Sequence, residues 1–194
     1  MLFRSVILAV GYLGEMIEAH LGSKFSGCDL IYSYETSALG TGGAIRQAMD
    51  FTSASHVFVS NGDTFINANF SALESAFERH PNLAASISVI HESNADRFAF
   101  VHWDKNTDLV TAFSNKGAAQ SGWINAGLYC LKVDKFKSMT TAGKFSIEQD
   151  FFEKRVDQAI IAAVALDSQF IDIGVPTDYE KAQSFIPQYS AQLR

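Results

Sequence analysis

Two aspartates that follow strand-like segments are the first candidates for chemistry in this chain. Asp63 closes the run of residues 56–63, in which an apolar, β-branched segment leads into Asn-Gly-Asp. Asp172 lies in a second such run, residues 170–174. Ligands of open α/β sheets bind beyond the carboxyl ends of the strands, and Mg²⁺ prefers one or two carboxylates together with substrate phosphates and waters. The pair is therefore a candidate Mg²⁺ site, although each aspartate alone would also suit a turn and the spacing leaves open whether they meet.

A glycine-rich segment precedes the first aspartate. Residues 39–44 read Leu-Gly-Thr-Gly-Gly-Ala and predict a turn that runs into a helix ending near residue 49. The first turn of a helix has backbone N–H groups without intrahelical partners, so Gly42 and Gly43 are expected to offer such groups to an anion. Tight turns and helix entries also select glycine, and the segment alone is therefore weak evidence for a ligand.

Other catalytic and metal-binding templates are absent from the sequence. It contains no GxSxG, HExxH, Walker A or EF-hand pattern, and its five histidines show no mutual ligand spacing. Cys28 and Cys130 are isolated, which favours two reduced, buried thiols and a cytoplasmic protein. The apolar run near the N-terminus is too short for a signal-peptide core, and no stretch is long enough to span a membrane.

The composition indicates one globular domain. At 194 residues the chain is long enough to bury a substantial core, and its hydrophobic content of 47% excludes a disordered chain. The net charge of −6 argues against a nucleic-acid partner, because phosphate contacts need clustered Lys and Arg. A small phosphorylated substrate remains compatible with this charge, since it needs only a few local cations or a metal.

Strand-like and helical segments alternate in the first half of the chain, and strands dominate the second half. Helices are predicted at residues 12–21, from the glycine-rich turn to about 49, from an Asn69 cap to about 81, at 145–156 with Ser146 as cap, and from Pro176 onward. Strands are predicted at residues 6–10, 30–34, 57–59, 84–90, 98–103, 109–113, 123–131, 160–166 and 170–173. This order predicts an α/β fold with a doubly wound, mainly parallel sheet and antiparallel additions.

Seven short motifs, in order along nearly the whole chain, carry a resemblance to a known family. They are Val-Gly-Tyr at 10–12, Leu-Gly-Thr-Gly-Gly-Ala at 39–44, Asn-Gly-Asp at 61–63, Phe-Ser-Asn-Lys at 113–116, Ile-Asn-Ala-Gly-Leu-Tyr at 124–129, Ser-Ile-Glu-Gln-Asp at 146–150 and Phe-Ile-Asp-Ile-Gly-Val-Pro-Thr-Asp-Tyr at 170–179. Each motif is unspecific by itself, but seven in order are a strong signal. The chain resembles the sugar-1-phosphate nucleotidylyltransferases, most closely the guanylyltransferases that act on D-glycero-D-manno-heptose 1-phosphate or mannose 1-phosphate. The resemblance implies the Rossmann-like fold of the nucleotide-diphospho-sugar transferases.

The resemblance also implies a role for each matching residue. Asp63 and Asp172 match two Mg²⁺-binding aspartates, and Lys116 matches a lysine that reaches the sugar phosphate; these three are the expected catalytic residues. The implied substrate-binding residues are Leu39, Gly40, Thr41, Gly42 and Gly43 at the nucleotide base and its sugar, Asn125, Gly127 and Glu148 in the sugar pocket, and Asn61, Gly62 and Gly174. The implied reaction transfers GMP from GTP to a sugar 1-phosphate and releases pyrophosphate, with Mg²⁺ as cofactor, and rests mainly on positioning and charge neutralisation. The alternatives are a solvated surface position for Lys116 and a helix-start role for Glu148.

One family feature has no counterpart in the sequence. The G-x-G-T-R-L phosphate loop, which should precede Val6, is absent together with its strand–loop–helix unit. Residues 1–194 are therefore expected to be a single nucleotidyltransferase-like domain that is truncated at its N-terminus and has weak or no activity. The strands at 6–10 and 57–59 are expected either to close against each other or to be covered by a second copy of the chain, since bare sheet edges invite association.

Two other functions fit parts of the sequence. A non-catalytic sugar-phosphate-binding or regulatory module would keep the pocket without turnover. An NAD-dependent α/β enzyme is disfavoured, because Gly-Tyr-Leu-Gly at 11–14 follows the first strand in place of GxGxxG.

Overall fold

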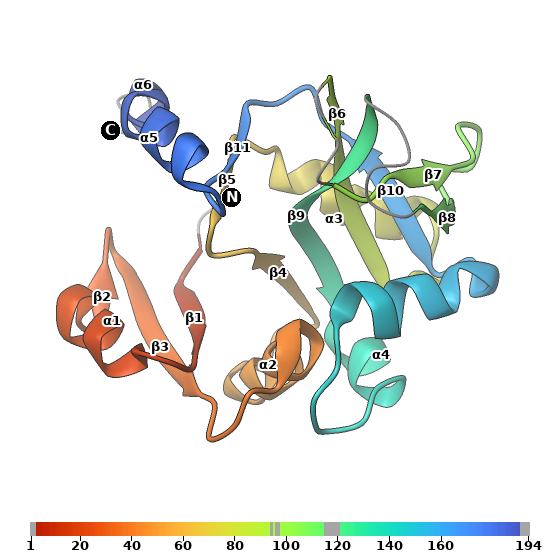
Figure 1. Ribbon diagram of the computed structural model, residues 1–194. Helices are drawn as coiled ribbons and strands as arrows, with labels where there is room; N and C mark the ends of the chain where they lie inside the picture. Colours follow the sequence, from red (N-terminus) through yellow and green to blue (C-terminus); the bar gives the residue numbers. More distant parts are fainter. Residues whose placement is uncertain (1–2, 94, 96–97, 115–120, 191–194) are drawn as a thin grey trace. The chain divides into compact units, whose positions relative to one another are not determined.

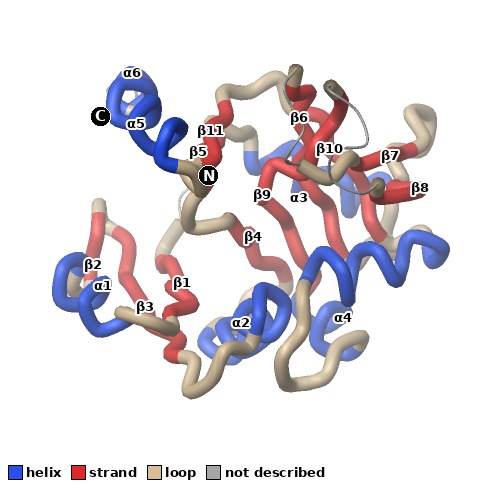
Figure 2. Tube along the Cα trace, viewed as in Figure 1, coloured by secondary structure: helices blue, strands red, loops and turns tan. Residues whose placement is uncertain are grey.

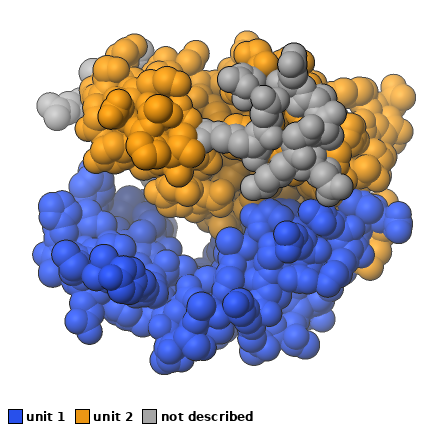
Figure 3. Space-filling view, viewed as in Figure 1, with its two compact units in different colours: residues 1–57, 132–157 blue, residues 58–131, 158–194 orange. Residues whose placement is uncertain are grey.

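Figure 1 shows the computed structural model of the chain, which describes residues 3–93, 95, 98–114 and 121–190. The chain divides into two compact units, coloured separately in Figure 3. Unit 1 comprises residues 1–57 and 132–157, and unit 2 comprises residues 58–131 and 158–194. The expectation that the chain is a single domain stays a prediction.

The sheet of unit 1 has the strand order β1-β3-β2. β1 (Ser5–Val10) and β3 (Cys28–Tyr34) run parallel, and β2 (Lys24–Phe25) pairs antiparallel with β3. The α1 helix (Gly14–Leu21) connects the two parallel strands, which need such a crossover. It ends at Gly22, whose φ of 68° costs glycine no strain. The predicted strand–helix–strand order at the start of the chain is confirmed.

A cluster of phenylalanines in unit 1 includes residues of two of its helices. α2 (Gly40–Ala48) continues into the 3₁₀ turn η1 (Met49–Phe51), and α4 is Val133–Ser138. The segment predicted as a helix over 145–156 forms a π-helix, η2 (Ile147–Phe152), followed by the 3₁₀-helix η3 (Glu153–Gln158). Phe136 of α4 and Phe151 of η2 are fully buried, with their ring centroids 4.7 Å apart. A π-helix is rare and often lies at a functional site.

The sheet of unit 2 has the order β10-β6-β9-β4. These strands are β10 (Ile161–Ala165), β6 (Ala85–Glu92), β9 (Gly122–Lys132) and β4 (His56–Ser60). β10 runs parallel to β6, and β9 runs antiparallel to it. The first six residues of β6 are buried, and they include Ser86 and Ser88, which interrupt the apolar sequence of the strand. The α/β class and the antiparallel additions are thus confirmed.

One face of this sheet is covered by α3 (Phe70–Arg79), as Figure 2 shows. Leu73, Ala76 and Phe77 of α3 form a buried cluster with alternate residues of β9, among them Ile124 and Leu128. Asn69 caps the helix as predicted, because its side chain accepts a hydrogen bond from the Ser71 N–H at 3.1 Å.

Two short antiparallel pairs complete unit 2. β7 (Val101–Trp103) pairs with β8 (Val110–Phe113), and β5 (Thr64–Ile66) pairs with β11 (Phe170–Asp172). β5 has no counterpart among the predicted strands. α5 (Pro176–Phe185) begins at a proline, as expected, and α6 (Pro187–Ser190) follows it. Phe65 of β5 stacks edge-on against Phe185 of α5, with ring centroids 6.1 Å apart.

The strands predicted at residues 6–10 and 57–59 belong to different sheets. β1 lies in the β1-β3-β2 sheet and β4 in the β10-β6-β9-β4 sheet. Closure of these strands against each other and cover by a second copy both stay predictions. Within the described ranges, no helix has both the length and the apolarity needed to cross a membrane.

Candidate functional site

The short β5–β11 pair brings the two candidate aspartates together. Asp172 pairs with Thr64, the residue that follows Asp63, and the Ile173 N–H donates to the Asp63 carbonyl at 2.8 Å. Gly174 lies beside both carboxylates. A Cβ built on Gly174 would be 3.0 Å from Asp172 Oδ1 and 3.9 Å from Asp63 Oδ2. The two carboxylates therefore converge on one point, which the sequence spacing left open.

These two carboxylates fit a hard divalent cation. The described residues contain no group of three or more His, Cys, Asp or Glu side chains placed to hold a metal. Two carboxylates are hard oxygen donors, which a divalent cation of this kind can combine with waters and substrate phosphates. The Gly174 N–H donates to Asp172 Oδ1 at 2.9 Å and so orients that carboxylate.

A hydrogen bond between Asn61 and Gly127 ties the residues that precede Asp63 to β9. The Asn61 N–H donates to the Gly127 carbonyl at 2.9 Å. Gly127 has a φ of 70°, and a Cβ there would lie 2.7 Å from the Asn61 side-chain nitrogen. Both the backbone conformation and the close approach require glycine. Gly62, by contrast, has open space around it.

A bulge in β9 carries Asn125 and Gly127. Between the pairs Ile87–Tyr129 and Val89–Asn125, one residue of β6 faces three residues of β9. The Gly127 N–H, which loses its ladder partner in the bulge, donates to Asn125 Oδ1 at 3.0 Å, and Asn125 Nδ2 donates to the Tyr129 hydroxyl at 2.9 Å. Bulges often lie next to active sites, where they redirect side chains. The role of Tyr129 could not be read from the sequence, because the bulge sets it.

The glycine-rich segment packs against residues 143–145 of the same unit. The N–H groups of Gly42 and Gly43 donate to the Phe145 carbonyl at 3.0 and 3.4 Å, and the Phe145 N–H donates to the Leu39 carbonyl at 2.9 Å. The expectation that Gly42 and Gly43 offer unpaired N–H groups to an anion is therefore wrong. A Cβ on Gly42 would contact the Phe145 ring, and one on Gly40, whose φ is 67°, would lie 2.7 Å from the Phe145 carbonyl oxygen. The glycines allow this close packing.

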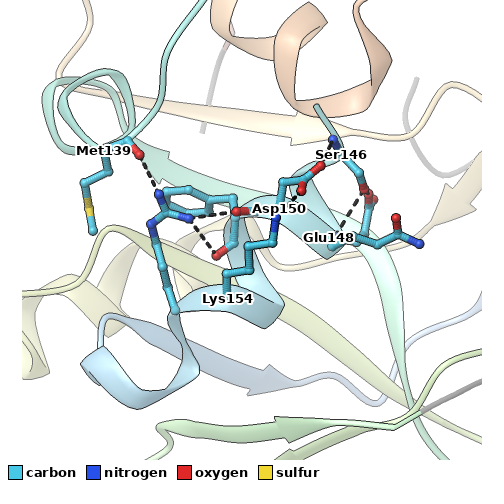
Figure 4. Close-up of polar contacts among 8 residues, drawn as sticks. Met139, Ser146, Glu148, Asp150 and Lys154 are labelled. Atoms are coloured by element: carbon cyan, nitrogen blue, oxygen red, sulfur yellow. Dashed lines mark hydrogen bonds and ion pairs between the residues drawn. The ribbon is translucent and has the colours of Figure 1, made fainter. Parts of the chain in front are cut away.

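Thr41 links the glycine-rich segment to Glu148. Thr41 Oγ1 donates to Glu148 Oε2 at 3.0 Å, and Ser146 Oγ donates to the same oxygen at 2.8 Å. Both hydroxyl oxygens also accept a backbone N–H: Thr41 Oγ1 from Ile147 at 3.0 Å, and Ser146 Oγ from Gln149 at 3.2 Å. The helix-cap role of Ser146 is thus confirmed, whereas its contact with Glu148, drawn in Figure 4, was not predicted.

The segment that carries Glu148 is fixed by charged groups further along it (Figure 4). Asp150 Oδ2 accepts the Ser146 N–H at 2.9 Å, and Lys154 Nζ lies 2.6 Å from Asp150 Oδ1. The hydrogen bond from Lys154, with that from the Ser146 N–H, holds the pKa of Asp150 below its usual value. Arg155 donates to the Met139 carbonyl at 2.6 Å and ties the segment to the end of α4.

The structure thus gathers most of the predicted site residues into three groups, one in unit 1 and two in unit 2. In unit 1, Thr41 of the Leu39–Gly43 segment forms a hydrogen bond with Glu148. In unit 2, Asp63, Asp172 and Gly174 form one cluster, and Asn61, Asn125 and Gly127 form another. Lys116 lies outside the described residues.

Comparison with known proteins gives consistent matches. A sequence model described as nucleotidyl transferase matches residues 2–189. The chain is 37% identical over 184 residues to the D-glycero-alpha-D-manno-heptose 1-phosphate guanylyltransferase of Aneurinibacillus thermoaerophilus, which covers 95% of this chain and 79% of that protein. The Campylobacter jejuni protein of the same name is 35% identical, covering 91% of this chain and 76% of its own length.

A solved structure has the same fold. The crystal structure of HddC from Yersinia pseudotuberculosis complexed with GMP-PN superposes with a TM-score of 0.78 and 28% sequence identity. The match covers 94% of this chain and 79% of that one.

Proposed function

Because the chain belongs to the nucleotidyl transferase family, whose model spans residues 2–189, we propose that it transfers GMP from GTP to a sugar 1-phosphate. The acceptor is D-glycero-D-manno-heptose 1-phosphate or mannose 1-phosphate, and the products are a GDP-sugar and pyrophosphate. The observation that carries the proposal is the convergence of the Asp63 and Asp172 carboxylates beside Gly174. The names of the relatives from Aneurinibacillus and Campylobacter support the acceptor and the base.

In the proposed reaction, an oxygen of the sugar 1-phosphate attacks the α-phosphorus of GTP. The bond from the α-phosphorus to the bridging oxygen breaks, and pyrophosphate leaves with the electron pair of that bond. The protein needs no nucleophile of its own, because transfers of this kind rest on positioning and on neutralising the phosphate charge.

A divalent metal ion is general in this family, and we propose Mg²⁺ as the ion of this chain. Asp63 and Asp172 would hold it, since their oxygens converge and are the hard donors that it prefers. When bound, the ion supplies charge neutralisation for the phosphates. The hydrogen bond from the Gly174 N–H keeps the Asp172 carboxylate in place for this role.

The remaining residues are proposed to bind the two substrates. Leu39, Gly40, Thr41, Gly42 and Gly43 would lie against the guanine base and ribose, in a turn that packing with Phe145 keeps rigid. Asn125, Gly127 and Glu148 would contact the acceptor sugar, with Glu148 accepting hydrogen bonds from its hydroxyls, and Asn61, Gly62 and Gly174 would border the phosphates. Lys116, by resemblance, would reach the sugar phosphate.

The test is pyrophosphate release by the 194-residue chain with Mg²⁺, a panel of nucleoside triphosphates and a panel of sugar 1-phosphates. Turnover with GTP and a heptose or mannose 1-phosphate supports the proposal. Turnover with another nucleoside triphosphate or another sugar 1-phosphate would show that the proposed base or the proposed sugar is wrong. Binding of a sugar 1-phosphate without turnover would favour the non-catalytic module instead. We also propose that both units belong to one domain, because a single family model spans them. A cytoplasmic location stays a prediction.

A further inference from the structure

A pocket of about 460 Å³ lies within unit 2, at the carboxyl ends of the parallel strands β6 and β10. Its lining runs from the last residues of β6 to Trp123 of β9 and through residues 165–170, which connect β10 to β11. Pockets of roughly 300–1,000 Å³ accommodate small ligands, and open α/β sheets bind ligands at this edge. The pocket therefore has the size and the place of a ligand site.

Two strands connect the lining of the pocket to residues of the candidate site. Trp123 lines the pocket and lies two residues before Asn125 in β9, while Phe170 lines it two residues before Asp172 in β11. Residues two apart in a strand point to the same face and are about 7 Å apart. On each strand, therefore, a lining residue of the pocket is two positions, or about 7 Å, from a predicted site residue.

Aromatic and cationic side chains fix the orientation of Trp123. The rings of His91 and Trp103 meet the Trp123 ring edge-on, with centroids 5.5 and 5.3 Å away. Lys105 Nζ lies 3.1 Å from the centroid of Trp103 and 4.8 Å from that of Trp123. Trp123 is thus held as a rigid apolar wall of the pocket rather than as a mobile surface side chain.

The polar part of the lining is dominated by oxygen-bearing groups. Glu92, Asp167, Ser168 and Gln169 line the pocket together with the imidazole of His91, and none of its described lining residues is a lysine or arginine. Carboxylates repel a phosphate but accept hydrogen bonds from hydroxyl groups. The pocket is therefore unsuited to the triphosphate or the sugar phosphate and suited to an uncharged, hydroxyl-bearing group.

The backbone around this polar lining is anchored at both ends. The Leu166 N–H donates to the Val89 carbonyl at 2.9 Å, and the Asn67 N–H donates to the Gln169 carbonyl at 3.0 Å. Residues 166–169 are thereby tied to β6 on one side and to the chain after β5 on the other. A preformed pocket loses little entropy when a ligand binds.

We propose that this pocket binds the exocyclic polyol chain of the acceptor sugar, and so selects a heptose 1-phosphate over a hexose 1-phosphate. Trp123 packs against the carbon chain, and Glu92 and Asp167 accept hydrogen bonds from its hydroxyls. A heptose of the manno configuration differs from mannose by one more hydroxyl-bearing carbon in this chain. The inference rests on the proposed function, since it names the acceptor of that same site.

Of the two tryptophans of the chain, Trp123 lines this pocket and Trp103 contacts Trp123, so tryptophan fluorescence, excited selectively over tyrosine, reports on the pocket. In Trp103→Phe, Trp123 is the sole tryptophan. D-glycero-D-manno-heptose 1-phosphate is expected to change its emission on titration, and mannose 1-phosphate, GTP and inorganic phosphate to change it less. Glu92→Gln should weaken heptose 1-phosphate binding, measured by calorimetry, about 10-fold or more while leaving mannose 1-phosphate binding unchanged. Asp167→Asn serves as a second variant, and Glu180→Gln on the exposed side of α5 as the matched control.

The outcomes separate the two proposals. Equal binding of both sugar phosphates, unaffected by Glu92→Gln and Asp167→Asn, would overturn the pocket assignment and leave the proposed function intact. A large emission change with GTP would assign the pocket to the nucleotide base and would also overturn its assignment to the sugar. If neither sugar phosphate binds and no pyrophosphate is released with either, the proposed function itself fails, and the pocket assignment falls with it.

Discussion

Thr41 and Glu148 are 107 positions apart in the sequence, yet the Thr41 hydroxyl donates to the Glu148 carboxylate at 3.0 Å. The same hydroxyl oxygen accepts the Ile147 N–H, so its single proton is directed at Glu148. The segment proposed to hold the base and the residue proposed to hold the sugar are thereby one hydrogen-bonded structure within unit 1. A change at Thr41 should be felt in the binding of both substrates.

Thr41→Val tests this connection. Valine keeps the shape of threonine but removes the hydroxyl, which leaves the Ile147 N–H without its acceptor and Glu148 without one donor. We expect kcat/KM for the sugar 1-phosphate to fall about 10-fold, which corresponds to the free energy of one hydrogen bond to a charged group. Steady-state pyrophosphate release measures this. Thr41→Ser restores the hydroxyl and should restore most of the rate, and a valine variant with wild-type kinetics would contradict the proposed role.

Gly127→Ala should destabilise the protein and damage the site together. Alanine at a φ of 70° is strained, and its Cβ would displace the Asn61 side chain. We expect a loss of about 1–3 kcal/mol in the free energy of unfolding, measured by urea titration. Gly62→Ala is the matched control in the neighbouring turn: a Cβ there has open space and should change stability little. Equal effects of the two substitutions would argue against the bulge geometry.

Asp63→Asn and Asp172→Asn should behave as changes to one site. Each removes one of two converging carboxylate charges, and each is expected to lower metal-dependent turnover on the order of 10²-fold, as loss of one electrostatic contact does in other enzymes. The double variant should be hardly slower than either single one, because groups that act as a unit are not additive. Asp134→Asn, on the exposed surface of α4, controls for a general loss of negative charge. Additive losses would mean that the two aspartates act separately.

The buried Cys130 thiol should make the stability of the protein depend on pH. Burial, and then the charge of Glu74, raise the pKa of the Cys130 thiol from 9.0 to about 12. The folded chain therefore keeps this proton to higher pH than the unfolded chain, and stability should fall as the pH rises between these two values. Cys130→Ala should flatten that fall in urea titrations between pH 9.0 and about 12. In native protein, a thiol reagent should label the half-buried Cys28 first.

The sequence predicted well those parts of the fold that local patterns determine. The apolar run at 84–90 is the buried strand β6, and the caps at Asn69 and Ser146 form the predicted hydrogen bonds. These features depend on the pattern of apolar residues and on the residue type at the position before a helix, and both can be recognised in the sequence alone.

Features set by contacts between distant segments could not be predicted. β5 is only three residues long and exists because Phe170–Asp172 pairs with it, so no local pattern marks it. The N–H groups of Gly42 and Gly43 were expected to be open, but the carbonyl of Phe145, which is 103 positions after Gly42 in the sequence, accepts their hydrogen bonds. The bulge at Gly127 also depends on the register between β6 and β9, which the sequence of β9 alone does not specify.

The β5–β11 pair, which carries Asp172 and begins next to Asp63, should unfold locally more easily than the four-stranded sheet of unit 2. It is a two-stranded ribbon of three residue pairs, separate from the four-stranded sheet, and such ribbons have little stability of their own. Amide hydrogens there should exchange with solvent through local opening long before those of β6 do. A ligand that bridges Asp63 and Asp172 would close this ribbon, and the Ile173 amide, bonded to the Asp63 carbonyl, would then become one of the slower-exchanging amides of the chain. Occupancy of the site could thus be followed at a single backbone hydrogen, without any turnover.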